Sequence, residues 1–375
     1  MTATARTPED GHPPTGPDGY AGQALRGLTY LGRLFDLGPR LPGAAREAVQ
    51  ALFAGWGHRT SREIDEPRAA RGQAPFEFSL VLHEPDPEVR IFLRPLAPEG
   101  PTTAADSWEQ GWRALRALEE QGAATLTRAD GLRDLFRPRS DRAAFGLCIA
   151  ATVRPTGITG VKAYFDTMAA GVDDNRRIVG EAMQRLGHGT AWHWLRDNDP
   201  AGITHLIPAF LALDLADSPQ ARIKFYTTVE ERSGAALGSR LDRLSPTARR
   251  TAAALLDTLP ADGPAALTAP GTRPTLCWNL TDDGRERPDD ATLYLPFHRY
   301  TPAGDEALDR LRTYVPPAHL HRLAGFLTHS TPDDAPGPAP NPFHWAATKL
   351  HRPAPAPLTL YAPAAVVDRA SRAVG

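Results

Sequence analysis

Hydrophobic and polar residues alternate strictly along a short stretch in the middle of the chain, Arg222-Ile223-Lys224-Phe225-Tyr226. Successive side chains of a β-strand point to opposite faces, so the polar residues of this stretch share one face and the apolar residues the other. The same phase recurs at Arg90-Ile91-Phe92-Leu93-Arg94, Lys162-Ala163-Tyr164, Thr292-Leu293-Tyr294 and Thr359-Leu360-Tyr361. These stretches lie roughly 60 to 75 residues apart, which indicates an internal structural repeat.

Helices are predicted between these stretches, because apolar residues recur there at intervals of three and four, as in Trp108, Trp112 and Leu115. The chain therefore divides into five units, each with helices followed by two strands. Helices are expected around residues 20–35, 43–56, 108–115, 126–136, 178–186, 192–195, 245–259, 306–315 and 318–327. Strands are expected over residues 76–80, 89–93, 145–153, 161–165, 206–215, 222–227, 275–280, 292–295, 343–350 and 358–362.

This order predicts an α+β fold in which a ten-stranded antiparallel β-barrel is ringed by α-helices. A closed barrel turns the apolar strand face outward onto the helices and the polar face inward. Ten strands enclose more space than side chains fill, which leaves a lumen for ligands. Residues 1–18 are rich in Pro, Gly, Thr and Asp, so we expect a disordered N-terminal tail there and one barrel domain over residues 19–375.

Composition excludes several classes of protein. The chain has 375 residues, 41% of them hydrophobic, and a formal net charge of −2, so nothing in its charge favours nucleic acid or an anionic membrane as partner. No apolar run approaches the roughly 20 residues of a membrane-spanning helix, and we expect a cytoplasmic protein. Cys148 and Cys277 lie in apolar runs far apart in the sequence and read as core residues rather than a disulfide or metal pair.

The polar strand face predicts the chemistry of the lumen. Its basic residues are Arg90, Arg94, Lys162, Arg222 and Lys224, and two of them are among only three lysines in the whole chain. Burying unpaired cations costs several kcal/mol each unless an anion compensates them, and Glu77 alone is too little. We therefore expect a ligand with several negative charges, most simply a phosphate or diphosphate bound without a metal.

Tyrosines share that face, at Tyr164, Tyr226, Tyr294 and Tyr361. A ring of aromatic faces stabilises a cation by up to about 2 kcal/mol per desolvated contact. Basic residues that bind an anion, next to aromatic rings that stabilise a cation, indicate a site for the ionisation of an organic diphosphate. An allylic diphosphate would leave its diphosphate with the basic residues and its carbocation among the tyrosines.

These stretches, together with Phe76-Glu77-Phe78-Ser79 and Gly160-Val161, resemble the dimethylallyltryptophan synthase family of aromatic prenyltransferases, in particular its bacterial indole branch. The resemblance covers the chain from about residue 20. It implies the αββα (ABBA) prenyltransferase barrel and secondary metabolism. It also implies metal-independent transfer of a dimethylallyl group from dimethylallyl diphosphate, a substrate rather than a cofactor, to the ring of tryptophan or a tryptophan-derived indole by Friedel-Crafts alkylation.

The resemblance also assigns roles to residues. It implies that Arg90, Lys162, Arg222 and Lys224 bind diphosphate, that the four tyrosines shield the carbocation, and that Glu77 accepts the indole N–H, with Glu77 and Lys162 catalytic. Cys277, Trp278 and Thr292 would line the donor pocket, where the small Cys277 leaves room for a geranyl group. Nearby cations are expected to keep Glu77 ionised. A monomer or weak homodimer is expected.

Departures from the family pattern and alternative functions stay open. Thr292 stands where the family often has Gln, Pro357 stands where a further tyrosine is common, and Arg94 is an extra cation that could pair with Glu77 or another acid. A phenol prenyltransferase of the same fold would not need Glu77 as an N–H acceptor. A non-catalytic barrel that binds a phosphorylated metabolite would not need four phased tyrosines. The sequence contains no phosphate loop ending in Gly-Lys-Ser/Thr, no GxSxG motif and no paired CxxC.

Overall fold

The structure is a computed structural model that describes residues 19–60, 74–82, 87–139, 143, 145–171, 173–198, 210–229, 231–268, 273–282, 286–332 and 337–374. The expected disordered tail, residues 1–18, lies outside the described residues and stays a prediction. The first part of one expected strand, residues 206–209, lies outside them too.

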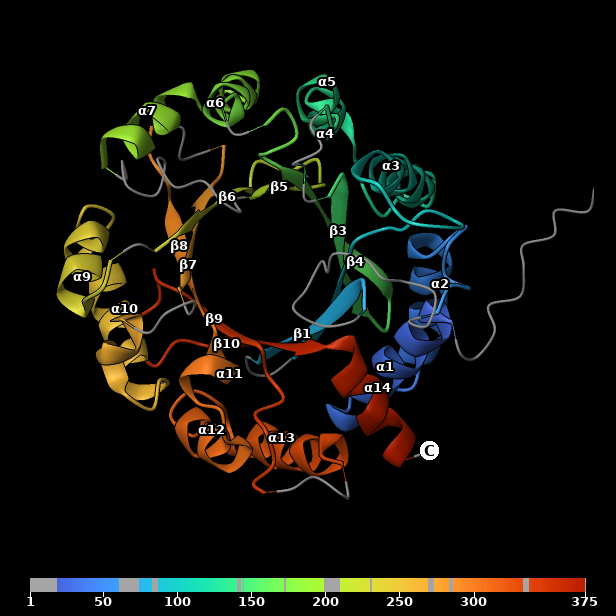
Figure 1. Ribbon diagram of the computed structural model, residues 1–375, viewed down its shortest axis with the longest axis vertical. Coiled ribbons are helices and arrows are strands. Elements are labelled where there is room, and N and C mark those ends of the chain that lie inside the picture. Colours follow the sequence, from blue (N-terminus) through green and yellow to red (C-terminus); the bar gives the residue numbers. More distant parts are fainter. Residues whose placement is uncertain are drawn as a thin grey trace, which may run out of the picture.

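Ten strands of the described residues form one closed antiparallel barrel, as the repeats predicted (Figure 1). Each strand pairs with its neighbours in the chain, and β10 pairs with β1 to close the sheet. The strands are β1 (Phe76–Leu82), β2 (Glu88–Leu93), β3 (Leu147–Arg154), β4 (Gly157–Asp166), β5 (Phe210–Asp214), β6 (Ile223–Thr228), β7 (Thr275–Leu280), β8 (Asp290–Leu295), β9 (Trp345–Lys349) and β10 (Leu358–Pro363).

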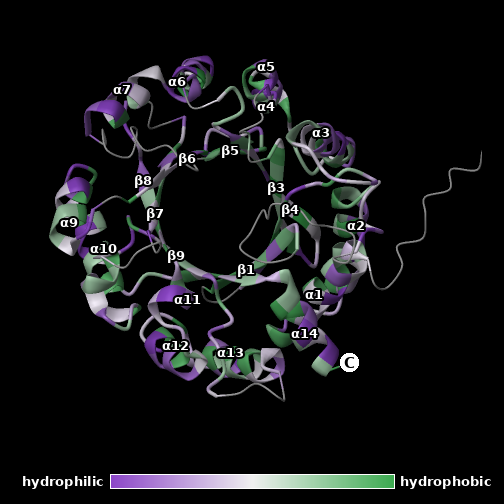
Figure 2. Ribbon diagram, in the orientation of Figure 1, coloured by the Kyte–Doolittle hydropathy of each residue, from purple (hydrophilic) through white to green (hydrophobic). Residues whose placement is uncertain are grey.

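Helices surround the barrel on all sides (Figure 1). They are α1 (Tyr20–Leu34), α2 (Leu41–Leu52), α3 (Ala104–Glu120), α4 (Thr127–Asp130), α5 (Arg133–Phe136), α6 (Asn175–Arg185), α7 (Gly189–Asn198), α9 (Gly234–Asp242), α10 (Pro246–Thr258), the 3₁₀ helix η2 (Gly263–Thr268), α11 (Phe297–Tyr300), α12 (Gly304–Leu311), α13 (Pro317–Ser330) and α14 (Ala364–Ala373). Hydrophilic segments are prominent on this outer ring (Figure 2). No helix in the described part of the chain is both long enough and apolar enough to cross a membrane.

Contacts with the helices show which strand residues face outward. Phe78 of β1 packs under α1 so closely that a Cβ on Gly27 would lie 2.4 Å from its ring, and Phe225 of β6 lies 5.7 Å from Trp192 of α7. Since side chains alternate along a strand, Glu77, Lys224 and their in-phase neighbours face the lumen. A small apolar cluster of Ala212, Tyr226 and Cys277 accordingly lies inside the barrel, apart from the main core.

Several helices were not expected from the sequence. Helix α9 has the sequence GAALGSRLD, in which apolar residues are too small and too few to give a clear period, and Ser233 caps its first turn by accepting from the backbone N–H of Ala236. The alanine-rich α14 packs between α1 and α13, which closes the helix ring next to the β1–β10 seam (Figure 1).

Candidate active site

The four basic residues assigned to diphosphate come together on the lumen wall. Arg90 lies on β2, Lys162 on β4, Lys224 on β6, and Arg222 directly precedes β6. Three of them, Lys162, Arg222 and Lys224, act on the carboxylate of Asp214, which ends β5 opposite Lys162. The Nε of Arg222 donates to Oδ2 of Asp214 at 2.7 Å, and Nζ of Lys162 lies 3.7 Å from Oδ1. We call Arg90, Lys162, Arg222 and Lys224 the cation group.

Burial shifts the lysines of the cation group strongly. Desolvation lowers the pKa of Lys162 to about 7; Asp214 opposes this shift, whereas Lys224, Arg90 and Arg222 reinforce it. Desolvation and then Arg222 lower the pKa of Lys224 to about 8. Burial opposes ionisation of Asp214, but the charges of Lys162, Arg222 and Lys224 outweigh it and lower its pKa to about 2. A bound anion would therefore stabilise the protonated lysines of this group.

Glu88 is a second carboxylate that the sequence prediction missed. It accepts a hydrogen bond from Arg90 at 2.6 Å and another from Arg154 at the end of β3. Glu88 is in phase with Arg90, so extending the predicted strand by one residue would have found it. Asp214 gave no such signal, because its pairing with Lys162 joins two different hairpins. Asp214 and Glu88 therefore compensate part of the basic charge that the sequence analysis had set against Glu77 alone.

The four tyrosines form a continuous arc beside the cation group. Ring centroids are 6.2 Å apart from Tyr164 to Tyr226, 5.8 Å from Tyr226 to Tyr294, and 5.8 Å from Tyr294 to Tyr361. Burial raises the pKa of all four phenols, that of Tyr361 to about 12. The arc is therefore neutral at physiological pH and offers π electrons rather than phenolate charge.

Phenylalanines extend this arc. The ring of Phe92 stands edge-on to Tyr164 at 5.1 Å, and Phe210 lies 6.2 Å from Tyr164 and 5.8 Å from Tyr226. The in-phase position of Phe92 between Arg90 and Arg94 already placed it on the lumen face, although the sequence alone gave it no role. Together these rings make an aromatic chamber.

Glu77 faces the lumen from β1, opposite Phe92, and is partly accessible there. Among the described residues, no lysine or arginine forms an ion pair with it, and burial raises its pKa to about 7. The expectation that nearby cations keep Glu77 ionised is therefore wrong. The carboxylates that Arg90, Lys162 and Arg222 contact are Glu88 and Asp214 instead.

The residues predicted to line a donor pocket divide between the two faces of the wall. Cys277 and Thr292 are register partners on the lumen face, and the Thr292 hydroxyl accepts a hydrogen bond from Asn279 at 3.2 Å. Trp278 instead points outward, with its ring 5.9 Å from Trp194 of α7 and under the guanidinium of Arg240. Trp278 is therefore removed from the predicted donor wall.

Arg94 does not belong to the cation group. It follows β2 four residues beyond Arg90, about 13 Å along an extended chain, and is 3% exposed. Its charge acts on Cys148, as do those of Asp166 and Glu77. Arg94 therefore belongs to the Glu77 end of the lumen. Both cysteines are buried and unpaired with each other, as predicted.

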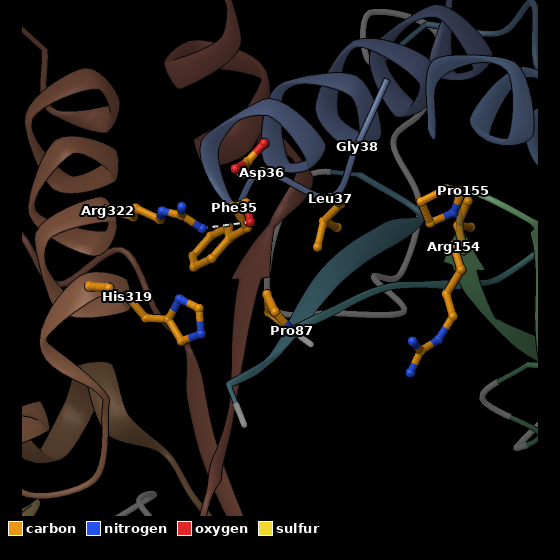
Figure 3. Close-up of a pocket in the computed structure, with 11 residues that line it drawn as sticks. Phe35, Asp36, Leu37, Gly38, Pro87, Arg154, Pro155, His319 and Arg322 are labelled. Atoms are coloured by element: carbon orange, nitrogen blue, oxygen red, sulfur yellow. Dashed lines mark hydrogen bonds between the residues drawn. The ribbon is translucent and has the colours of Figure 1, made fainter. Parts of the chain in front are cut away.

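A separate pocket of about 630 Å³ opens at the barrel rim (Figure 3). Its walls come from the end of α1, the start of α13 and the β3–β4 turn, with Phe35, Arg154 and Arg322 among its lining residues. Arg322 donates to the carbonyl of Phe35 at 2.6 Å. This pocket lies outside the lumen, and Arg154 links it through Glu88 to Arg90.

Metal ligands are not gathered in the part of the chain that the structure describes: no group of three or more His, Cys, Asp or Glu side chains there is arranged to hold an ion.

A closed antiparallel barrel within a ring of helices, with cations and aromatic rings on its inner wall, defines the ABBA prenyltransferases. The sequence profile described as "Tryptophan dimethylallyltransferase" matches residues 66–322. The chain therefore belongs to the tryptophan dimethylallyltransferase family, and the protein is a prenyltransferase. Curated protein sequences contain no match to it.

Solved structures support this membership. The prenyltransferase PriB in complex with product diphosphate superposes with a TM-score of 0.77 at 26% identity, over 93% of this chain and 97% of PriB. The 5-dimethylallyl tryptophan synthase of Streptomyces coelicolor, in complex with DMASPP and Trp, also gives 0.77 at 26% identity, over 93% and 96%. The 6-dimethylallyltryptophan synthase of Micromonospora olivasterospora shares the fold, with a TM-score of 0.74 at 22% identity over 93% and 98%.

Proposed function

We propose that this prenyltransferase transfers a dimethylallyl group from dimethylallyl diphosphate to the indole ring of tryptophan or a tryptophan derivative. The observation that carries the proposal is the inner wall, where the cation group borders an unbroken arc of tyrosines. Similar solved structures hold the same classes of ligand: one contains product diphosphate, and another contains DMASPP and Trp.

In the proposed reaction, the cation group binds the diphosphate and stabilises the charge that develops as the bond between allylic carbon and oxygen breaks. The diphosphate leaves with the bonding electron pair. The tyrosine arc surrounds the resulting allyl cation, which its π faces stabilise and which water would otherwise capture. An indole carbon then attacks the cation, and loss of the proton from that carbon restores the aromatic ring.

Glu77 is proposed to bind the indole N–H. A bound N–H donor would lower this carboxyl's pKa from about 7 and favour the ionised form, because a hydrogen bond to the charged form stabilises it. That bond strengthens as the ring becomes positive during attack, so it stabilises the transition state more than the bound substrate.

We propose that no metal takes part, because the cation group supplies the neutralising charge that Mg²⁺ provides in other diphosphate enzymes. Geranyl diphosphate is proposed as a second donor, since Cys277 and Thr292 are small residues on the lumen wall beside the arc.

The test is incubation of purified protein with dimethylallyl or geranyl diphosphate and tryptophan in EDTA, with products identified by mass spectrometry and NMR. Parallel reactions contain a phenolic acceptor, and Mg²⁺ in place of EDTA. We expect ring-prenylated tryptophan at equal rates with and without Mg²⁺. Prenylation of the phenol alone would overturn the indole assignment, and activity only with Mg²⁺ would overturn metal independence.

A further inference from the structure

Asp214 occupies a special position within the cation group. Its side chain is 15% exposed and lies between Lys162 of β4 and Arg222. Oδ2 accepts from Nε of Arg222 at 2.7 Å and from the Arg222 backbone N–H at 3.3 Å. Oδ1 is buried and receives no hydrogen bond from the described residues; the Lys162 ammonium, 3.7 Å away, is its ion-pair partner. One carboxylate thus orients a guanidinium and faces an ammonium.

The Asp214 carboxylate favours the charged, protonated form of the Lys162 amine. The groups that act on it are Asp214 from β5, Lys224 from β6, Arg222 before β6 and Arg90 from β2. Asp214 alone among these four favours the protonated amine, whereas the other three and burial itself favour the neutral amine. A neutral Lys162 would present no charge to a diphosphate.

We propose that Asp214 is a positioning residue for the donor: it favours the protonated form of Lys162 and fixes the Arg222 guanidinium, so that both side chains are oriented and charged to bind a diphosphate. The inference rests on the proposed function and extends it to a residue that the diphosphate does not need to touch.

This role predicts that removing the Asp214 carboxylate has opposite effects on donor binding at low and at high pH. Asp214 also places a negative charge beside the donor and repels it. At low pH, Lys162 is protonated with or without Asp214, so Asp214→Asn should bind donor as well as or better than wild type. At high pH, the variant should lose the Lys162 charge earlier and bind donor more weakly. Above both pKa values, each unit of downward shift in the Lys162 pKa weakens binding by about tenfold.

The experiment measures the Kd of the unreactive analogue dimethylallyl thiolodiphosphate by calorimetry, for wild type and Asp214→Asn, from pH 5 to pH 9. The ratio of the two Kd values cancels the acid–base titration of the analogue's own diphosphate. We expect the ratio of variant to wild type to rise from about 1 or below at pH 5 to on the order of 10 at pH 9. Asp214→Asn/Lys162→Arg, in which arginine stays charged, should give a ratio that does not vary with pH.

A direct readout guards against a variant that folds poorly. The chain contains only three lysines, so ¹³Cε-lysine labelling gives a spectrum in which Lys162 is assigned by its loss in Lys162→Arg. Its pKa should fall in Asp214→Asn and stay near the wild-type value in Asp214→Glu. A Kd ratio that is constant across pH, or an unchanged Lys162 pKa in Asp214→Asn, overturns the inference. Failure of wild type to bind the analogue at any pH overturns the proposed function instead.

Discussion

At the residue scale, burial in the lumen and the neighbouring charges together set the pKa values of the ionisable side chains. Lys162 and Lys224 are buried enough to lower their pKa values to about 7 and 8, and a bound diphosphate would reverse both shifts. The same burial raises the pKa of Glu77 to about 7. Because these pKa values lie near 7 or 8, a bound ligand can change the protonation state of each side chain.

The lysines give the first prediction. Lys162→Ala or Lys224→Ala removes a charge-assisted contact to the leaving diphosphate, worth roughly 1.5 to 3 kcal/mol, so kcat/KM for the donor should fall about 10- to 150-fold. Steady-state kinetics with circular dichroism as a folding check would measure this. Arg177→Ala, which removes an exposed cation from α6 on the outer ring, is the control and should leave these kinetics unchanged. Near-normal kinetics in both lumen variants would remove the diphosphate assignment.

Glu77 gives a prediction about stability. Its folded pKa of about 7 exceeds the unfolded value of about 4.3, so the folded state binds the proton more tightly and wild type loses stability as pH rises through this window. Glu77→Gln cannot ionise. The free energy of unfolding of this variant relative to wild type, measured by urea denaturation, should therefore rise between pH 4 and pH 7. It should then level off at a gain of up to about 3 kcal/mol. The exposed Glu109→Gln serves as control, and a pH-independent difference would contradict the burial of Glu77.

At the scale of elements, the barrel wall sets which side chains reach the chemistry. Because side chains alternate along each strand, Cys277 faces the lumen whereas its neighbour Trp278 packs on α7 outside the barrel. Helices pack tightly on the outer side. At Gly146, just before β3, a Cβ would lie 2.1 Å from the carbonyl oxygen of Ala104 and 2.3 Å from the backbone nitrogen of Trp108.

Gly146→Ala should therefore destabilise the fold, because backbone atoms of the α3 region cannot rotate away as a side chain can. We expect a loss of about 3 kcal/mol in the free energy of unfolding, measured by urea denaturation. Gly43→Ala is the matched control: nothing lies within 4 Å of its Cβ, and alanine favours helix α2, so this variant should be neutral or more stable by up to about 1 kcal/mol. Equal stability of the two variants would show that α3 does not press on the barrel here.

Much of this wall could be predicted from sequence because a strand's period is simple. The lumen positions of Lys162, Tyr226 and Tyr294 followed from alternation alone. Contacts between separate units could not be predicted this way. Asp214 meets Lys162 only through the register of β4 on β5, and the raised pKa of Glu77 comes from a degree of burial that alternation alone does not give.

At the scale of the whole molecule, five repeated units close into one barrel whose inner and outer faces have different tasks. The helix ring surrounds the outer face (Figure 1) and packs on it through apolar contacts, whereas the inner face carries the cations, the tyrosine arc and Glu77. Helix α14 completes the ring beside the seam between first and last strands, so the closed lumen depends on both ends of the described chain. We propose that this lumen holds an indole by its N–H against a shielded allyl cation.

The most direct measurement of that claim is kcat for tryptophan and for 1-methyltryptophan, each with wild type and with Glu77→Gln. Wild type should prefer tryptophan strongly, and Glu77→Gln should lower kcat on tryptophan by on the order of 10² to 10³ with a smaller effect on the acceptor KM. The variant should distinguish the two acceptors less than wild type does, because the neutral amide oxygen of glutamine accepts only a weaker hydrogen bond from the N–H. A Glu77→Gln enzyme that stays fully active on tryptophan, or that keeps the full wild-type preference between the two acceptors, would contradict the indole assignment.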